Sequence, residues 1–389
     1  MLNTASVKSI LTLRYDNTKK PFLPKLVAKD FQTKRKIQPG LIEKNIIFNL
    51  KKQICEYDGP LSISLSGGID SALILGILSK HFPKNEIHAT TIKFAESVDE
   101  TETASKIAKK LGTLHHIVEI KNYFKEFDKI ISLTDSPFWD IHWYYAAKNA
   151  KKYSKFLITG DGADELFAGY TFRYSKYLSL LKKNSDVSEK INFYLECHER
   201  DHVPDQSRIF GEKIKFNWNQ IKKNLLPFFD NSLSPLDQVF LADYNGKLSY
   251  NFSLINKIIS NKLEINYISP FLSKELILNS AMMFDYEKYD FKKNIGKLPL
   301  RNLLKKYGLD TFVSKEKFGF SVNPKNLWKN YGYDLCKKFL INGKTLEDNL
   351  INKKWVLENI NKENLDIRYI NKFYGLLALE IWYSKQKVR

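Results

Sequence analysis

Short apolar strands alternate with amphipathic helices along the first half of the chain. The pattern predicts strands at 61–65, 87–94, 115–120 and 155–160, with helices between them at 72–78, 100–112 and 123–133. A further helix is expected at 41–54, just before the first strand. Strands that alternate with helices across short turns are typical of the α/β class, so we expect a doubly wound, mostly parallel sheet.

The strand signals fade beyond about residue 175, and the second half of the chain has mainly helical periodicity. We therefore expect three parts. Residues 1–40 form an N-terminal extension with little core of its own, 41–175 form the α/β core, and 176–389 form a predominantly helical part that completes the site.

Composition limits the function without naming it. The 389 residues carry 62 Lys and Arg against 43 Asp and Glu, a formal charge of +19. Because the lysines are spread along the chain, we interpret them as a solvated surface, and nucleic acid is not the expected partner. The sequence contains no run of 18 apolar residues and no secretory pattern, which predicts a cytoplasmic protein without a membrane segment. The three cysteines are far apart, so neither a zinc site nor a disulfide framework is indicated.

The turn "SGGIDS" (66–71) follows the first predicted strand and opens a helix. Gly67 and Gly68 let backbone N–H groups approach a ligand, and the start of the helix attracts anions. Asp70 either caps the helix or holds Mg²⁺ beside a polyphosphate. The turn alone leaves a plain strand-to-helix connection and a phosphate site equally open.

A second glycine turn, "GDGADELFAGY" (160–170), follows the strand predicted at 155–160. It brings Asp161, Asp164 and Glu165 within five residues, and crowded carboxylates repel one another unless a cation compensates. An acidic start to a helix is the alternative interpretation. Because ligands bind at the carboxyl ends of parallel strands, the two turns together favour a metal–nucleotide site with Asp70 and Asp164 as Mg²⁺ ligands.

The segment "SKEKFGFSVNP" (314–324) is a third candidate, basic and rich in aromatic residues. Lys315 and Lys317 could be ordinary surface lysines. A lysine held by aromatic neighbours could instead stabilise charge that develops on a phosphate.

These three pieces together resemble the asparagine synthetases, whose synthetase domain has the ATP-pyrophosphatase (PP-loop) fold. The resemblance spans roughly residues 40–385. "SGGIDS" is similar to the loop that holds pyrophosphate, and "GDGADELFAGY" is close to the family's pattern, with Ala168 in place of a glycine. "KFGF" matches the family's Lys-x-Gly-Phe loop, and "GKLPLRNLL" (296–304) resembles the basic segment before it.

The resemblance implies a set of site residues. The catalytic residues are Lys317 for transition-state charge, Asp161 as the base that deprotonates the attacking amine, and Glu165. Mg²⁺ is implied on Asp70 and Asp164. The residues implied to bind ATP are Leu65, Ser66, Gly67, Gly68, Asp70, Ser71, Ile92, Thr159 and Gly160.

The implied reaction is an ATP-dependent, AMP- and pyrophosphate-forming amide ligation, with aspartate, ammonia and asparagine as the first candidate. A ligase for another carboxylate, similar to β-lactam or macrolactam synthetases, is an alternative, and a tRNA-modifying PP-loop enzyme is a second one. The family's glutaminase domain has no counterpart before Ser66, so glutamine is not expected to support the reaction. A separate glutaminase subunit and a homodimer both remain open.

Two segments depart from the family's pattern. The family's Glu-x-Arg-x-Pro-Phe-Leu-Asp reads "NYISPFLS" (266–273) here, so that two acids and an arginine are replaced. "DSPFWDIHWYYAAK" (135–148) has Ser136 for a glutamate and four bulky aromatic residues where smaller ones are usual. Both segments bear on the acceptor, so adenylation is better supported than aspartate as the substrate.

Overall fold

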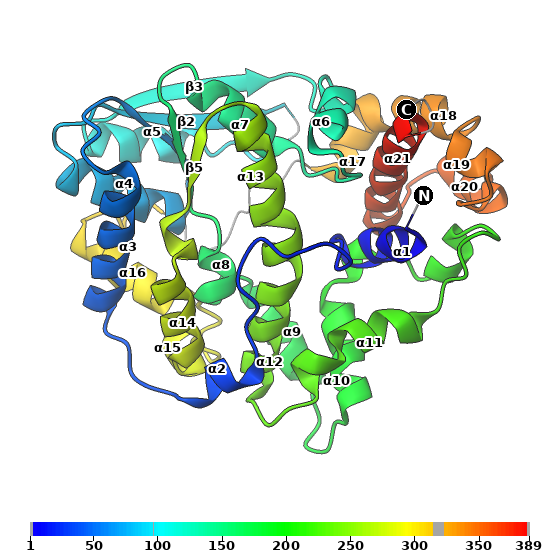
Figure 1. The fold of residues 1–389 in the computed structure, drawn as a ribbon, viewed down its shortest axis with the longest axis horizontal. Coiled ribbons are helices and arrows are strands. Elements are labelled where there is room, and N and C mark those ends of the chain that lie inside the picture. The colour runs from blue at the N-terminus through cyan, green and yellow to red at the C-terminus, as the bar shows by residue number, and fades with distance from the viewer. Residues whose placement is uncertain (1–2, 96, 314–322, 387–389) are drawn as a thin grey trace.

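A five-stranded parallel sheet forms the centre of the first half of the protein. The computed structural model describes residues 3–95, 97–313 and 323–386. The strand order is β3-β2-β1-β4-β5, and every neighbouring pair is parallel (Figure 1). The predicted α/β class is therefore confirmed. The strands are β1 (Leu61–Ser64), β2 (Ile87–Phe94), β3 (Leu114–Ile120), β4 (Phe156–Ile158) and β5 (Asn266–Ile268).

Helices connect the strands and cover both faces of the sheet. The path from β1 through β2 to β3 runs toward one edge of the sheet, and the chain then crosses to β4 on the other side of β1. Right-handed crossovers in opposite directions place their helices on opposite faces. One face thus packs against α4 (Ile69–His81) and α5 (Thr101–Lys110), and the other packs against α7 (His142–Ala150).

The reversal between β1 and β4 decides where a ligand can bind. Two adjacent parallel strands whose connections leave in opposite directions have their carboxyl ends side by side, and the loops that follow diverge. Here those loops are the two glycine turns, since β1 ends at Ser64 and β4 at Ile158. The fold therefore puts both motifs at one edge of the sheet.

Most strand boundaries lie within two residues of the predicted ones, but β5 is a strand that the sequence pattern did not predict. It has only three residues and lies between helical segments, so alternation could not reveal it. Because β5 pairs with β4, the sheet continues beyond the residue range expected for the α/β core.

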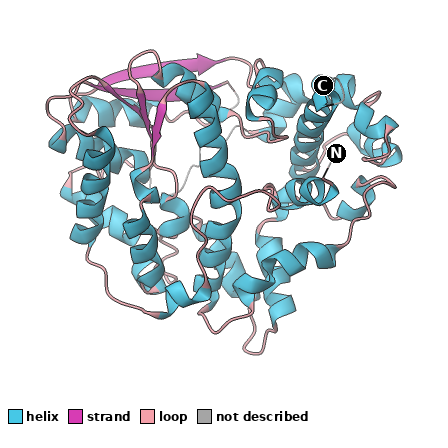
Figure 2. Cartoon of the chain, in the orientation of Figure 1, coloured by secondary structure: helices cyan, strands magenta, loops and turns pink. Residues whose placement is uncertain are grey.

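The second half is predominantly helical, as the pattern predicted, and Figure 2 shows that helices dominate the chain outside the sheet. Among the described helices, none has both the length and the apolar character needed to cross a membrane. The other helices of the chain are α1 (Thr4–Leu13), α2 (Ala28–Gln32), α3 (Pro39–Ile54), α6 (Phe127–Thr134), α8 (Ala163–Leu166), α9 (Thr171–Leu180), α10 (Val187–Cys197), η1 (Glu199–Asp201), η2 (Gln206–Ile209), α11 (Trp218–Phe229), α12 (Pro235–Asp243), η3 (Tyr244–Phe252), α13 (Ser253–Lys262), η4 (Pro270–Leu272), α14 (Lys274–Met282), α15 (Asp285–Lys288), α16 (Leu298–Lys306), α17 (Pro324–Leu327), η5 (Trp328–Gly332), α18 (Tyr333–Leu340), α19 (Lys344–Glu347), α20 (Lys353–Ile360) and α21 (Ile367–Gln386).

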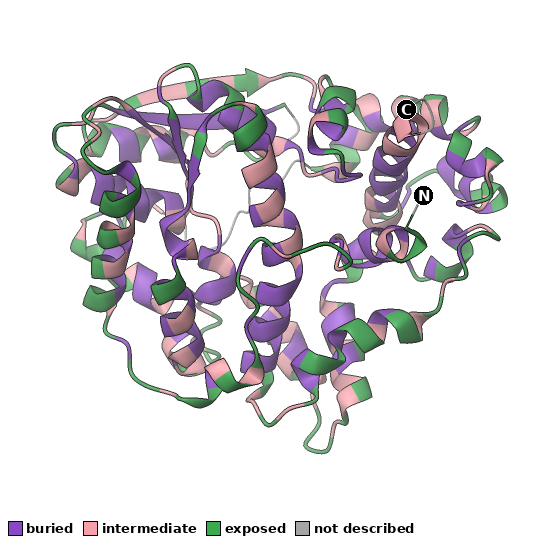
Figure 3. Cartoon of the chain, in the orientation of Figure 1, coloured by how far each residue is buried: buried purple, intermediate pink, exposed green. Residues whose placement is uncertain are grey.

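Two apolar cores hold these elements together, and the buried positions of Figure 3 follow them. One core joins β1 and α4 to the helices around α8, α9, α12 and α16. The other joins α6, α7 and α21 to α1. Val7, Ile10 and Leu11 of α1 are at most 2% exposed, so this face of the helix is covered by distant parts of the chain.

Candidate active site

The loop after β1 folds around two serine hydroxyls. The Ser66 N–H donates to Ser71 Oγ at 3.0 Å, and the Gly68 N–H donates to Ser66 Oγ at 3.1 Å. Helix α4 begins at Ile69, and no side chain of the described residues caps it through a hydrogen bond. The start of a long helix carries a partial positive charge, which suits an anion.

Glu100 places a carboxyl group against this loop. Burial raises the pKa of the Glu100 carboxyl, while a hydrogen bond from the Gly67 backbone opposes that rise. A carboxylate oxygen thus accepts from one of the N–H groups that a phosphate would use. Glu100 could not be predicted from the sequence, because the residue follows β2 and reaches the loop only in the folded chain.

Three of the predicted nucleotide-binding residues are buried near the carboxyl ends of strands β1, β2 and β4. The Leu65 N–H donates to the Thr90 carbonyl at 2.9 Å, and its own carbonyl accepts from Thr91 Oγ1 at 2.9 Å. Ile92 is 5% exposed, and its side chain belongs to the apolar core. Thr159 is also buried, and its hydroxyl donates to Asp161 at 2.9 Å. The structure thus places their side chains in the protein interior.

The loop after β4 lies directly against the first loop. A Cβ atom at Gly160 would lie 2.8 Å from the Cβ of Asp70, so a side chain there would force the two loops apart. Gly162 has a φ of +87°, a conformation that glycine adopts without steric cost, and it lets α8 begin at Ala163. The glycines of "GDGADE" therefore bring Asp164 toward Asp70.

Lys297 joins these two carboxylates. Its Nζ lies 2.5 Å from Asp70 Oδ2 and 2.7 Å from Asp164 Oδ1. Burial alone would lower the pKa of Lys297, but the charges of Asp164 and Asp70 raise it above its ordinary value. Asp70 and Asp164, predicted from separate motifs, are thus brought together. Lys297 belongs to the "GKLPLRNLL" segment, whose resemblance to the family was the one available signal.

Asp161 lies in a buried environment rich in hydrogen-bond donors. Its Oδ2 accepts from Asn256 Nδ2 at 2.6 Å, Tyr267 Oη at 2.6 Å and Thr159 Oγ1 at 2.9 Å. Burial raises the pKa of Asp161, while hydrogen bonds from these groups and from Trp143 oppose the rise. A carboxyl whose pKa is raised, yet whose anion is hydrogen-bonded, can accept a proton near neutral pH more readily than an ordinary aspartate.

The aromatic residues of the segment 135–148 have two different environments. Trp139, Tyr144 and Tyr145 are at most 6% exposed and belong to the core around α7 and α21. Trp143 instead points toward Asp161 and packs against Phe252, with ring centroids 5.4 Å apart. Of this segment, Trp143 is therefore the residue that the structure brings to Asp161.

Glu165 has different neighbours from the other two acids of its motif. It is 4% exposed and accepts a hydrogen bond from Tyr170 Oη at 2.6 Å. The Tyr170 ring in turn lies under the guanidinium of Arg173, with 4.4 Å between Cζ and the ring centroid. In the described contacts, Glu165 meets neither Lys297 nor Asp161. Lys317 lies outside the described residues.

The carboxylates at this edge suit Mg²⁺ as a group that arrives with phosphates. Mg²⁺ prefers oxygen ligands and commonly uses one or two carboxylates together with substrate phosphates. Asp70 and Asp164 supply two carboxylates close enough to contact one ammonium. Among the described residues there is no cluster of three His, Cys, Asp or Glu that could hold a metal alone. The donor set therefore fits a shared Mg²⁺ rather than a resident metal.

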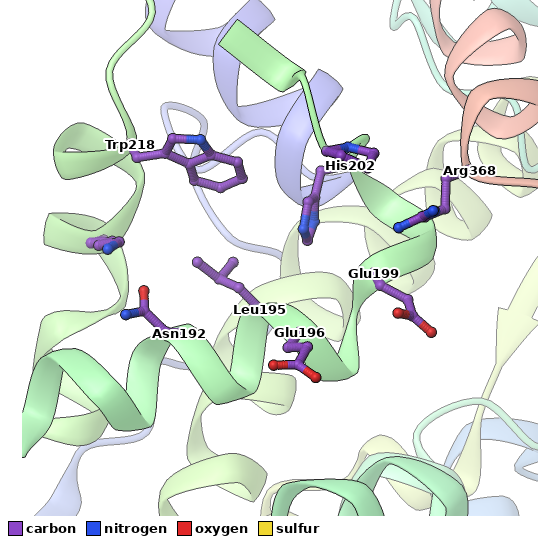
Figure 4. Close-up of a pocket in the computed structure, with 9 residues that line it drawn as sticks. Asn192, Leu195, Glu196, Glu199, His202, Trp218 and Arg368 are labelled. Atoms are coloured by element: carbon purple, nitrogen blue, oxygen red, sulfur yellow. The ribbon is translucent and has the colours of Figure 1, made fainter. Parts of the chain in front are cut away.

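A pocket of about 420 Å³ lies elsewhere, between α10, α11 and the start of α21 (Figure 4). Trp218, His202 and Arg368 form part of its wall, with Glu196 and Glu199 at its edge. Burial lowers the pKa of His202 to about 4, so this imidazole is neutral. None of the candidate site residues lines this pocket.

A doubly wound parallel sheet, with a phosphate-type loop and paired carboxylates at the ends of two central strands, defines a nucleotide-binding α/β protein. A family model described as asparagine synthase matches residues 50–384. The chain belongs to the asparagine synthase family.

Curated relatives carry the same description. Asparagine synthetase [glutamine-hydrolyzing] 1 of Bacillus subtilis is 26% identical over 367 residues, which cover 84% of this chain and 56% of the relative. Putative asparagine synthetase [glutamine-hydrolyzing] 2 of Methanocaldococcus jannaschii is 29% identical over 38% of this chain and 29% of its own length. In the longer match, this chain spans about half the length of its relative. The solved structure of a U34-tRNA thiolase from Methanococcus maripaludis covers 87% of this chain and 78% of its own, at 14% identity and a TM-score of 0.32, a likeness too distant to inform function.

Proposed function

We propose that the protein is an ATP-dependent ligase that joins a carboxylate to an amine and releases AMP and pyrophosphate. Aspartate and ammonia, giving asparagine, are the first candidate substrates. Membership of the asparagine synthase family supports this class of reaction. The alternative of a tRNA-modifying enzyme has only the net charge of +19 in its favour.

One observation carries the proposal. Asp70 and Asp164 lie in the first turns of α4 and α8, which follow two adjacent central strands, and both contact the Lys297 ammonium at 2.7 Å or less. They lie beside the Ser66–Ser71 loop at the start of α4, where the N-cap makes no side-chain hydrogen bond. Paired carboxylates next to an anion-binding loop are the arrangement that a metal-bound polyphosphate requires.

Each part of the site then has a task. The Ser66–Ser71 loop would bind the phosphates through N–H and hydroxyl groups. Mg²⁺ held by Asp70 and Asp164 would neutralise charge on the pyrophosphate that leaves. Lys317 is proposed to stabilise charge on the α-phosphate in the transition state. Glu165 is proposed to act through Tyr170, because that hydroxyl is its hydrogen-bond donor.

The proposed reaction has two steps, adenylation of the carboxylate and transfer of the acyl group to the amine. A carboxylate oxygen of the substrate attacks the α-phosphorus of ATP, and the bond to pyrophosphate breaks, which leaves an acyl-adenylate. The amine then attacks the acyl carbon, AMP leaves, and a proton from the amine passes to Asp161. The raised pKa of Asp161 suits this transfer, because a more basic carboxylate accepts the proton more readily.

Pyrophosphate release, measured against a panel of carboxylates with ammonium as the amine, tests the proposal. We expect pyrophosphate and AMP in equal amounts and asparagine when aspartate is supplied. ADP and phosphate as products would overturn the mechanism. A protein that released no pyrophosphate with any carboxylate would overturn the reaction class.

A second candidate is a ligase of the same chemistry for a larger carboxylate. The observation in its favour is Trp143, a bulky indole that hydrogen-bonds to Asp161 at the proposed base. An aromatic surface beside the base favours an acceptor with apolar bulk over aspartate. Within the same panel, this candidate predicts faster pyrophosphate release with aromatic or cyclic carboxylates than with aspartate.

A further inference from the structure

Arg173 lies beside the second glycine turn without an ion pair of its own. It is half-buried in the first turn of α9, and its Cζ lies 4.4 Å from the centroid of the Tyr170 ring. Across residues 3–95, 97–313 and 323–386, no hydrogen bond and no ion pair engages the Arg173 side chain. A guanidinium presents five N–H donors in a planar fork, so this side chain retains its capacity for an anion.

We propose that Arg173 is a specificity-determining residue that binds a second carboxylate of the acceptor, which makes the substrate a dicarboxylate. The inference rests on the proposed function, because that function identifies a carboxylate as the group that ATP activates. The activated carboxylate is engaged at the strand ends, so the group that Arg173 binds is a different one. Arginine suits this task, since its fork matches the two oxygens of a carboxylate.

Two elements that supply groups around Asp161 also flank Arg173. The first is the glycine turn, which contains Asp161 and ends at Tyr170 beneath the guanidinium. The second is η3 with α13, whose Asn256 donates to Asp161 at 2.6 Å. The charge of Asp243, at the start of η3, also acts on Arg173. Because α8 packs against η3, the guanidinium lies between two neighbouring segments that both reach the proposed base.

The acids around Arg173 have partners of their own. Asp243 accepts a hydrogen bond from Tyr194 Oη at 2.9 Å, and Asp201 forms an ion pair with Lys247. Burial alone would lower the pKa of Arg173, but the charge of Asp243 and of other groups nearby raises it, so the guanidinium is fully charged. A carboxylate at hydrogen-bond distance interacts with the fork more strongly than acids that lie beyond ion-pair range.

A counter-charge for Asp243 is the competing role for Arg173. In that role, the loss of the guanidinium would lower the stability of the protein and leave its choice among acceptors unchanged. If Arg173 binds the acceptor, its loss weakens binding of dicarboxylates and leaves binding of monocarboxylates as it was. Selectivity between two such ligands therefore separates the two roles, whereas stability alone does not.

Titration calorimetry with two matched pairs of ligands tests the inference. β-Alanine is aspartate without its α-carboxylate, and propanoate is succinate without one of its carboxylates. We expect the unchanged protein to bind the dicarboxylate of at least one pair about tenfold more tightly or better, since a hydrogen bond to a charged group is worth about that much. Arg173→Met should remove this advantage by weakening the dicarboxylate alone.

Two further variants serve as controls. Arg173→Lys keeps the charge without the fork and should keep part of the advantage. Arg208→Met removes an arginine whose side chain is 54% exposed and should leave the advantage unchanged. If Arg173→Met does not fold, Arg173→Gln supplies the same comparison.

Equal affinity for the two members of each pair in the unchanged protein would overturn the inference, and so would an advantage that survives Arg173→Met. The titration needs no ATP and no turnover. A protein that prefers dicarboxylates through Arg173 but releases no pyrophosphate would contradict the proposed reaction alone. A protein that releases pyrophosphate without this preference would contradict the role of Arg173 alone.

Discussion

Two clusters of partly buried charge lie in different regions of this molecule. The strand-end cluster consists of Asp70, Asp164 and Lys297 at the carboxyl ends of β1 and β4. The interhelix cluster joins α1, η1 and η3. Its residues are Arg14, Asp140, Asp201 and Lys247. Arg14 Nη2 lies 2.5 and 2.6 Å from the two carboxylate oxygens of Asp140, and Lys247 forms an ion pair with Asp201.

Exposure does not distinguish these clusters, but their surroundings do. The side chains of Asp164 and Asp140 are 23% and 22% exposed. The strand-end cluster lies at the first turn of α4, a long helix whose N-cap makes no side-chain hydrogen bond. The interhelix cluster is enclosed between helices, and Lys372 of α21 also donates to the Asp201 carbonyl at 3.0 Å. Charged groups at the start of a long helix are suited to an anionic ligand, while ion pairs enclosed between helices serve the fold.

The largest expected effect separates function from stability in the strand-end cluster. Asp164→Asn removes a proposed metal ligand, so pyrophosphate release should fall by on the order of 10³ or more. Thermal unfolding should shift by only a few degrees, because Lys297 keeps Asp70 as a partner. Asp290→Asn, which alters a partly exposed acid elsewhere, is the control. Near-normal turnover in Asp164→Asn would remove this residue from the site.

The interhelix cluster should respond in the opposite way. Asp201→Asn leaves Lys247 without its buried counter-charge, while Arg14 keeps Asp140. Removing one partner of a buried pair costs about 3–5 kcal/mol of unfolding free energy. Urea denaturation measures that loss. At low temperature, where the variant is folded, pyrophosphate release per folded molecule should stay within about twofold. A loss of activity without a loss of stability would place Asp201 in the site instead.

The third prediction concerns pH. Burial raises the pKa of Asp161, and a base acts only when it is ionised. Amide formation should therefore rise with pH through a pKa above the ordinary aspartate value of about 3.9 and level off above it. The pH profile of kcat/KM for the amine measures this limb, and Asp161→Asn should lack it. An identical limb in that variant would assign the titration to another group.

The smallest expected effect lies in the backbone that supports the strand-end cluster. Ala168 has a φ of +60°, where a side chain costs about 1–2 kcal/mol relative to glycine. Ala168→Gly should raise the unfolding free energy by about 0.5–1 kcal/mol, since greater freedom of the unfolded chain offsets part of the gain. Ala163→Gly, within α8, should lower it by about 1 kcal/mol. Denaturant midpoints compare both variants, and a loss of stability in Ala168→Gly would contradict the argument.

The sequence predicted the parts of the site that local spacing encodes. Glycine turns after buried strands indicated Ser66–Ser71 and Asp161–Glu165 as candidate site segments. The parallel topology was enough to expect that these two segments lie side by side. The contact of Gly160 with Asp70 follows from that expectation. The α/β class could be predicted for the same reason, because the strands are short, apolar and regularly spaced by helices.

The remaining parts depend on contacts between distant segments. Lys297 is 227 positions from Asp70, and Asn256 is 95 from Asp161. The local sequence around each of these two residues is that of an ordinary surface or helical segment. Tyr267 comes from a three-residue strand too short to show alternation. Resemblance drew attention to the Lys297 segment, but only the fold revealed its contact with the two acids.

The docking of α1 onto α21 has a consequence for the order in which the protein is made. Lys372 of α21 donates to the Leu11 carbonyl at the end of α1, a contact that spans 361 positions (the two helices lie side by side in Figure 1). At 5–20 residues per second, a ribosome needs about 20–70 s to reach Lys372 after Leu11. During that interval α1 has emerged, yet its apolar face has no α21 to cover it. We expect limited proteolysis of stalled nascent chains to cut within α1 until α21 has left the ribosome, and early protection would show that another segment covers it first.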